Sequence, residues 1–188
     1  MQGTCERTGD ELILRFERHF TQTIDRLWQA LTDPSELTKW IAGDEAVVEL
    51  RPGGRVWFSG HGGIESTIVE LDAPHVIAYG WRTNEWEGGV IRWELSEEGG
   101  GTKLSFTHRM PEPDKQEQER LMKKMGFGPE MYDPIPRNLA GWHSLIDALA
   151  VAIEGQSATQ GTPQENADEP DWKKLHRMYV EAHGTNGS

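Results

Sequence analysis

The sequence has almost no cysteine. Cys5 is the single cysteine in 188 residues, so the chain cannot form an intramolecular disulfide, and no group of cysteines and histidines has the spacing of a zinc site. We therefore expect neither a metal nor a cofactor. The chain also has no apolar run long enough to span a membrane and no apolar signal segment after Met1. We expect a cytoplasmic protein.

Positive charge is also scarce. The chain has 19 lysines and arginines against 31 aspartates and glutamates, a formal net charge of -12. Nucleic-acid binding depends on lysine and arginine contacts with phosphates, and anionic membranes attract basic segments. The charge therefore argues against both partners. It leaves open a small-molecule binding domain, an enzyme and a protein-interaction module.

Tryptophan and glycine, in contrast, are abundant, and the pattern of apolar residues and turn residues along the chain predicts a sheet. Apolar and polar residues alternate along residues 12–20, as in a half-buried strand. Helical spacing follows in residues 23–31 and 34–41, where Asp33 is a good N-cap and Glu36 completes a capping box. Six further strands with short turns predict an antiparallel meander. They span residues 46–50, 56–59, 64–71, 76–82, 90–96 and 102–109.

The rest of the chain is predicted to be helical or irregular. Residues 111–136 form a methionine-rich insertion with a short charged helix, and we expect it to act as a lid. A long helix over 138–154 carries an apolar stripe that includes Trp142. His143 and Asp147 lie off that stripe, so a solvated pair is favoured over metal ligands. Residues 1–11 are predicted to be flexible, 156–170 a disordered linker, and 171–183 a short amphipathic tail helix, dispensable for folding.

Four motifs, taken in order, resemble those of a known superfamily. They are residues 28–40, Pro52-Gly53-Gly54-Arg55, the run 68–74 leading to Trp81, and residues 101–108 followed by Gly141-Trp142. The order is similar to that of the START-like (SRPBCC, helix-grip) superfamily, in the branch named for the activator of the heat-shock-protein-90 ATPase. The resemblance implies one α+β domain over residues 12–155. In this fold a curved antiparallel sheet, here of about seven strands, wraps around a long C-terminal helix and leaves an interior cavity.

The residues expected to line that cavity are mostly aromatic. In the sixth strand of the meander, His108 alternates with Phe106 and Met110, which predicts that it points inward. Glu65 shares a side with Thr67, and that side also could face the cavity. We predict that these residues bind a small hydrophobic or amphipathic ligand. The full set is Trp57, Glu65, Tyr79, Trp81, Trp93, Phe106, His108 and Trp142.

Purely structural roles for the polar residues of this set stay open, and so do two other functions for the protein. His108 can equally be a strand-end histidine satisfied by backbone or water, and Glu65 a solvated carboxylate. If both face the cavity, the pair His108 and Glu65 suits an enzyme similar to the polyketide cyclases and aromatases of the same superfamily. A third alternative is a protein-interaction module or homodimer that acts through the outer surface and the tail helix.

Overall fold

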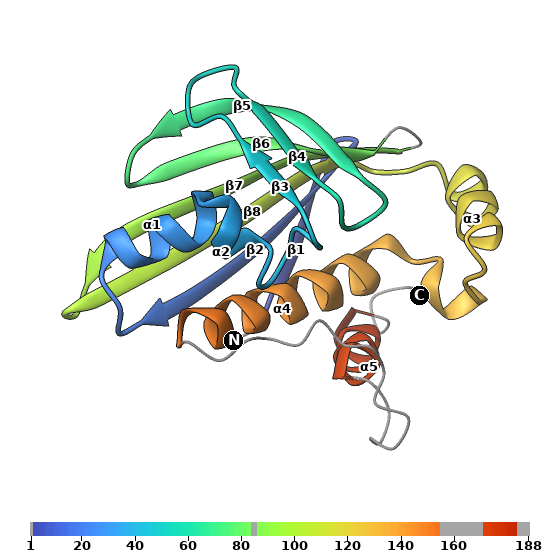
Figure 1. Cartoon of the computed structure of the whole chain (residues 1–188). Helices are drawn as coiled ribbons and strands as arrows, with labels where there is room; N and C mark the ends of the chain where they lie inside the picture. Colours follow the sequence, from blue (N-terminus) through green and yellow to red (C-terminus); the bar gives the residue numbers. More distant parts are fainter. Residues whose placement is uncertain (1, 84–85, 155–170, 184–188) are drawn as a thin grey trace.

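The computed structural model describes residues 2–83, 86–154 and 171–183, and it shows one antiparallel sheet with helices along it (Figure 1). The sheet has eight strands in the order β1-β2-β8-β7-β6-β5-β4-β3. The predicted α+β helix-grip architecture is confirmed, with one strand more than expected. The strands are β1 (Thr4–Thr8), β2 (Glu11–Phe20), β3 (Ala46–Val48), β4 (Arg55–Phe58), β5 (Ile64–Asp72), β6 (Val76–Thr83), β7 (Trp86–Glu98) and β8 (Gly101–Pro111).

The additional strand lies in the segment predicted to be flexible. β1 pairs antiparallel with β2, with Thr4 opposite Arg15, across a turn in which Gly9 adopts a φ of 66°. Most side chains of β1 are exposed. Its sequence therefore lacks the apolar alternation that identifies a half-buried strand, and backbone pairing at the sheet edge holds it in place.

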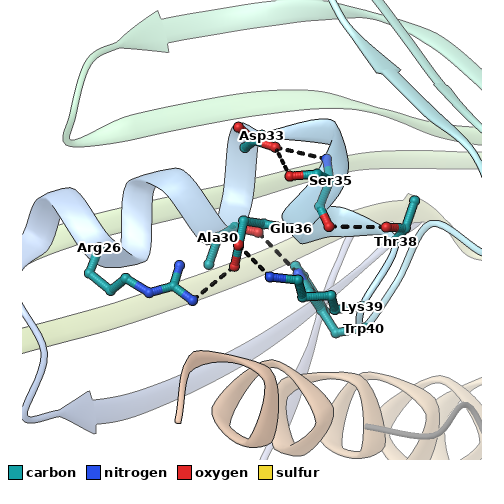
Figure 2. A network of polar contacts seen from close by, with 8 residues as sticks. All are labelled: Arg26, Ala30, Asp33, Ser35, Glu36, Thr38, Lys39 and Trp40. Carbon is teal, nitrogen blue, oxygen red and sulfur yellow. Dashed lines mark hydrogen bonds and ion pairs between the residues drawn. The ribbon is translucent and has the colours of Figure 1, made fainter. Parts of the chain in front are cut away.

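Two short helices, α1 (Ile24–Thr32) and α2 (Pro34–Leu37), follow β2 and meet at Asp33. The backbone N–H of Asp33 donates to Gln29 O at the end of α1, while its carboxylate accepts from Ser35 N at 2.8 Å at the start of α2 (Figure 2). One residue thus closes one helix and opens the next, as predicted for the N-cap.

A polar network fixes the angle between these two helices. Glu36 of α2 accepts from Nη2 of Arg26 in α1 at 2.8 Å and from Nζ of Lys39 at 2.5 Å (Figure 2). Trp40, which follows α2, donates its indole N–H to Ala30 O at 3.0 Å. The tryptophan ring is buried in the core, so this bond satisfies a donor that would otherwise be desolvated.

The long helix α4 (Pro134–Ile153) packs its apolar residues against the inner face of the sheet. It begins at Pro134 and not at residue 138, with Asp133 as a side-chain N-cap on Ile135 N at 2.9 Å. Pro134 and Pro136 both lie in the first helical turn, where a missing N–H costs nothing because those groups have no partner within the helix.

The tail helix α5 (Asp171–His183) packs against α4. Tyr179 is fully buried; its hydroxyl oxygen accepts from Gly3 N at 2.8 Å and lies 3.0 Å from Nδ1 of His143. The expectation that His143 lies on a solvated face is therefore wrong, because the residue is buried. The helix predicted over residues 171–183 is present, and its packing argues against its being dispensable for folding. The predicted linker 156–170 lies outside the described residues.

Among the helices in the described parts of the chain, none is both long and apolar enough to cross a membrane.

Candidate functional site

Six of the eight predicted cavity residues meet in one aromatic cluster inside the sheet. The ring centroids of Trp93 and Phe106 lie 4.4 Å apart, those of Phe106 and Trp142 also 4.4 Å, and those of Trp81 and Trp142 4.9 Å. Tyr79 packs edge-on against Phe58 at 6.0 Å, and burial raises the pKa of the Tyr79 phenol. The cluster members pack against one another, as core residues do. They are Tyr79, Trp81, Trp93, Phe106, His108 and Trp142.

His108 has a partner at each ring nitrogen. Trp142 of α4 donates its indole N–H to Nδ1 of His108 at 2.9 Å, which requires that Nδ1 carry no proton. Nε2 then carries the proton and donates to Gly88 O. Burial lowers the pKa of His108 to about 4, so the ring is neutral at physiological pH. This geometry matches the satisfied strand-end histidine and not a general base.

Trp57 and Glu65, the other two predicted residues, lie on the outer face of the sheet. In β4 and β5 the buried positions are Val56, Phe58, Ile64 and Ser66, so the residues between them point outward. Trp57 and Glu65 are direct cross-strand neighbours. The prediction that both face the cavity is therefore wrong.

The face of β5 was misassigned because the side that carries Glu65 and Thr67 also carries apolar residues further along the strand. Val69 is 62% exposed, and a register irregularity separates Ile68 from Glu70. The Glu65 carboxylate instead pairs with the guanidinium of Arg55 at 2.8 Å in solvent, which holds the pKa of Glu65 below its usual value. Glu65 and His108 cannot act on one substrate, because the sheet lies between them.

A pocket of about 540 Å³ opens beside the aromatic cluster, between helix α3 (Lys115–Lys124) and the β4–β5 hairpin. We call it the α3 pocket. Trp81 is the only predicted site residue in its wall. The remaining residues that line it are His61, Gly62, Ile64, Gln118, Leu121, Met122, Met125, Phe127, Arg137 and Asn138.

Arg137, in the first turns of α4, is the single arginine or lysine of this wall. It donates from Nη1 to Met131 O at 2.9 Å and contacts the Met122 sulfur at 3.1 Å. With its side-chain oxygen toward the guanidinium, Gln118 accepts from Nη2 at 2.9 Å. Burial lowers the pKa of Arg137 to about 10, against an opposing effect of Asp133. The group remains a cation at neutral pH.

A second pocket, of about 690 Å³, lies along the other side of α3 and shares Gln118, Leu121, Arg137 and Asn138 with the first. Its wall is far more polar and includes Glu112, Asp114 and Glu117. Among the described residues, carboxylates line the second pocket together with Arg120 and Lys124, whereas no carboxylate lines the α3 pocket.

Sequence reasoning missed Arg137 and Gln118. The available signal was a lone arginine at the start of an apolar helix, where the helix dipole disfavours a cation. No group of three or more histidine, cysteine or carboxylate side chains within the described ranges could hold a metal ion. The His143 and Asp147 pair, with 3.6 Å between Nε2 and Oδ2, lies beside α5.

Comparison with known proteins identifies one family that matches most of the chain. The family described as "Activator of Hsp90 ATPase homolog 1-like protein" matches residues 21–154. No curated protein shows significant similarity to the chain.

Solved structures share the fold at low sequence identity. A conserved protein of unknown function, EF2215 from Enterococcus faecalis, is 19% identical, with 99% of this chain and 92% of that chain covered and a TM-score of 0.68. CalU16 from Micromonospora echinospora is 18% identical over 95% and 94% of the two chains, with a TM-score of 0.61. The Aha1 dimer from Colwellia psychrerythraea is 18% identical over 79% and 98%, with a TM-score of 0.54.

Proposed function

We propose that this chain, which belongs to the family of Activator of Hsp90 ATPase homolog 1-like proteins, binds a small apolar or amphipathic molecule in the α3 pocket. The observation that carries the proposal is the wall of that pocket. It combines the ring of Trp81 with aliphatic, methionine and phenylalanine side chains and only a few polar groups. Concave sites of a few hundred Å³ with this composition are typical of small-molecule binding.

The methionines of α3 suit such a role. Met122 is buried and Met125 is exposed, and both line the pocket. Methionine is unbranched and polarizable, so it adapts to irregular apolar surfaces. Phe127 continues the apolar wall beyond the end of α3, after a glycine with a φ of 82° at position 126.

The proposed site differs in place from the one predicted by sequence. The predicted residues in the interior contact each other as a core. The α3 pocket lies beside them, under the segment predicted to act as a lid. Trp81 belongs to both. Its ring centroid lies 4.9 Å from that of Trp142 and 5.5 Å from that of His61, with the rings tilted in both pairs, so it connects the core to the pocket wall.

A fluorescence titration tests this proposal. Nile red, a neutral apolar dye, should bind the wild-type protein with increased emission. Phe127→Ala should weaken binding roughly tenfold, because burial of an aromatic side chain is worth about 1.5–3 kcal/mol. Val69→Ala, at an exposed position of the outer sheet face, is the control and should bind as the wild type does. Absence of binding, or equal binding to all three proteins, would overturn the proposal.

The alternative functions fare differently. The cyclase-like enzyme needed His108 and Glu65 in one cavity, and they lie on opposite faces of the sheet. The protein-interaction module and the homodimer stay predictions, since a shared fold with the Aha1 dimer at 18% identity does not extend to assembly.

A further inference from the structure

We infer that the α3 pocket is selective for amphipathic anions, and specifically for a monocarboxylate whose apolar body lies against Trp81 and α3 while its carboxylate meets Arg137. This inference rests on the proposed function and specifies the ligand class of the same site. It comes from a charge that the described residues leave without an anionic partner.

Among the described residues, the direct contacts of the Arg137 guanidinium are with neutral acceptors, and the carboxylate of Asp133 acts on it without forming an ion pair. Its contacts are the Met131 carbonyl, the Met122 sulfur and the Gln118 amide. No carboxylate within the described ranges forms an ion pair with it, although acidic residues outnumber basic ones 31 to 19 in the chain. A largely buried charge is stable when it is paired and hydrogen-bonded, and a bound anion would supply the missing pair.

The charge distribution around the pocket also favours an anion there. Every carboxylate that lines either pocket belongs to the far side of α3, where Glu112, Asp114 and Glu117 lie. The α3 pocket has Arg137 and otherwise uncharged or apolar groups, with His61 at its rim. Arg137 also lies near the N-terminal, positive end of α4, which adds to the potential that an anion would meet.

The same charges select among anions. A guanidinium presents a planar fork that matches a carboxylate in a bidentate contact. A phosphate monoester would bring nearly two negative charges close to a chain of net charge -12. A singly charged carboxylate on an apolar body meets the cation and the apolar wall with the least repulsion.

Calorimetric titration with a matched pair of probes tests the inference. Decanoate and decanol both have chains of ten carbons, and they differ in the head group, a carboxylate in one and a hydroxyl in the other. At pH 8 and concentrations below micelle formation, wild-type protein should bind decanoate roughly 10- to 100-fold more tightly than decanol, the range for hydrogen bonds to a charged group. Arg137→Gln should bring the two dissociation constants together, and Arg137→Lys should restore only part of the difference.

Arg120→Gln is the control variant. Arg120 lines the second pocket and not the α3 pocket, so its loss should leave the preference for decanoate intact. If the wild type binds both probes equally, the anion selectivity is wrong and the proposed apolar site stands. If Arg120→Gln and Arg137→Gln reduce the preference equally, the preference arises from the overall surface charge and not from a specific contact with Arg137, and the inference is wrong. If neither probe binds, the proposed function falls with the inference. The comparison of decanoate with decanol on the wild-type protein does not depend on the folding of any variant.

Discussion

Trp142 of α4 and His108 of β8 are joined by a hydrogen bond of 2.9 Å between the indole N–H and Nδ1, in an interior where both rings are buried. This bond links the long helix to the middle of the sheet. It also fixes the tautomer of His108, so that Nε2–H donates to Gly88 O of β7. Three segments far apart in the sequence are thus held by one imidazole.

Loss of this bond should destabilise the protein more than loss of ring area alone. Trp142→Phe leaves Nδ1 of His108 buried without a donor, and we expect a loss of about 2–4 kcal/mol in urea unfolding. Trp142→Ala should cost about 3–5 kcal/mol.

Trp93→Phe is the matched comparison for that measurement. Within the described residues the buried indole nitrogen of Trp93 has no partner in hydrogen-bonding geometry, only the nearby Tyr79 hydroxyl, so replacement by phenylalanine removes similar area and leaves no acceptor that depended on a well-formed bond. It should be less destabilising than Trp142→Phe by roughly 1–2 kcal/mol. Equal losses would mean that the hydrogen bond to His108 contributes nothing.

The buried neutral state of His108 predicts a stability that falls in acid. In the unfolded chain the histidine takes up a proton near pH 6.5, whereas in the native protein it does so only near pH 4. Between these values the unfolded state binds more protons, so the free energy of unfolding decreases as the pH falls. From pH 7 to pH 5 this amounts to roughly 2 kcal/mol. His108→Gln should flatten the profile of unfolding free energy against pH by that amount.

The sequence predicted most of the sheet because alternation is a local signal. Strands β2 to β8 were all predicted from it and from the turn residues between them, and the junction at Asp33 was found from capping chemistry. Alternation does not say which of two faces is the inner one. In β5 the bulge after Ile68 changes the parity, so Glu65 was placed inward. Arg137 was missed because its burial depends on α3, which lies on a different segment.

The strand β1 and the packing of α5 were missed for a common physical reason, although the helix α5 itself was predicted over residues 171–183. Both segments make contacts distant in sequence. Tyr179 of α5 meets Gly3, 176 positions away, and His143 of α4. The pattern of a segment does not report a partner surface elsewhere in the chain.

Docking of α5 should therefore contribute to global stability. Truncation after Glu154 removes the buried Tyr179 ring and uncovers part of α4, and we expect the melting temperature to fall by roughly 5–10 °C. Tyr179→Phe, which keeps the ring but loses the contacts with Gly3 N and His143, should give a smaller decrease. Val180→Ala, at an exposed position of the same helix, is the control. An unchanged melting temperature after truncation would restore the expectation that the tail is dispensable.

Helix α3 should behave as a lid over its pocket. One side of α3 is anchored by buried Gln118 and Met122, while Met125 and Phe127 are exposed in the empty protein. Gly126, with a φ of 82°, offers a pivot between them that costs no side-chain strain. Few buried apolar contacts hold the helix, and such segments open with little free energy. Amide hydrogens over residues 115–127 should therefore exchange quickly in the free protein.

Ligand binding should slow that exchange if α3 closes on the ligand. Addition of Nile red or decanoate should protect residues 115–127, whereas amides of β2 and β8, which pair with each other along their length, should exchange slowly in both states and serve as the internal reference. The protection should be lost in Phe127→Ala at the same dye concentration, because less ligand is bound. High protection of α3 without any ligand, unchanged on addition, would identify the segment as a static cap, since a helix already closed gains nothing from an occupant.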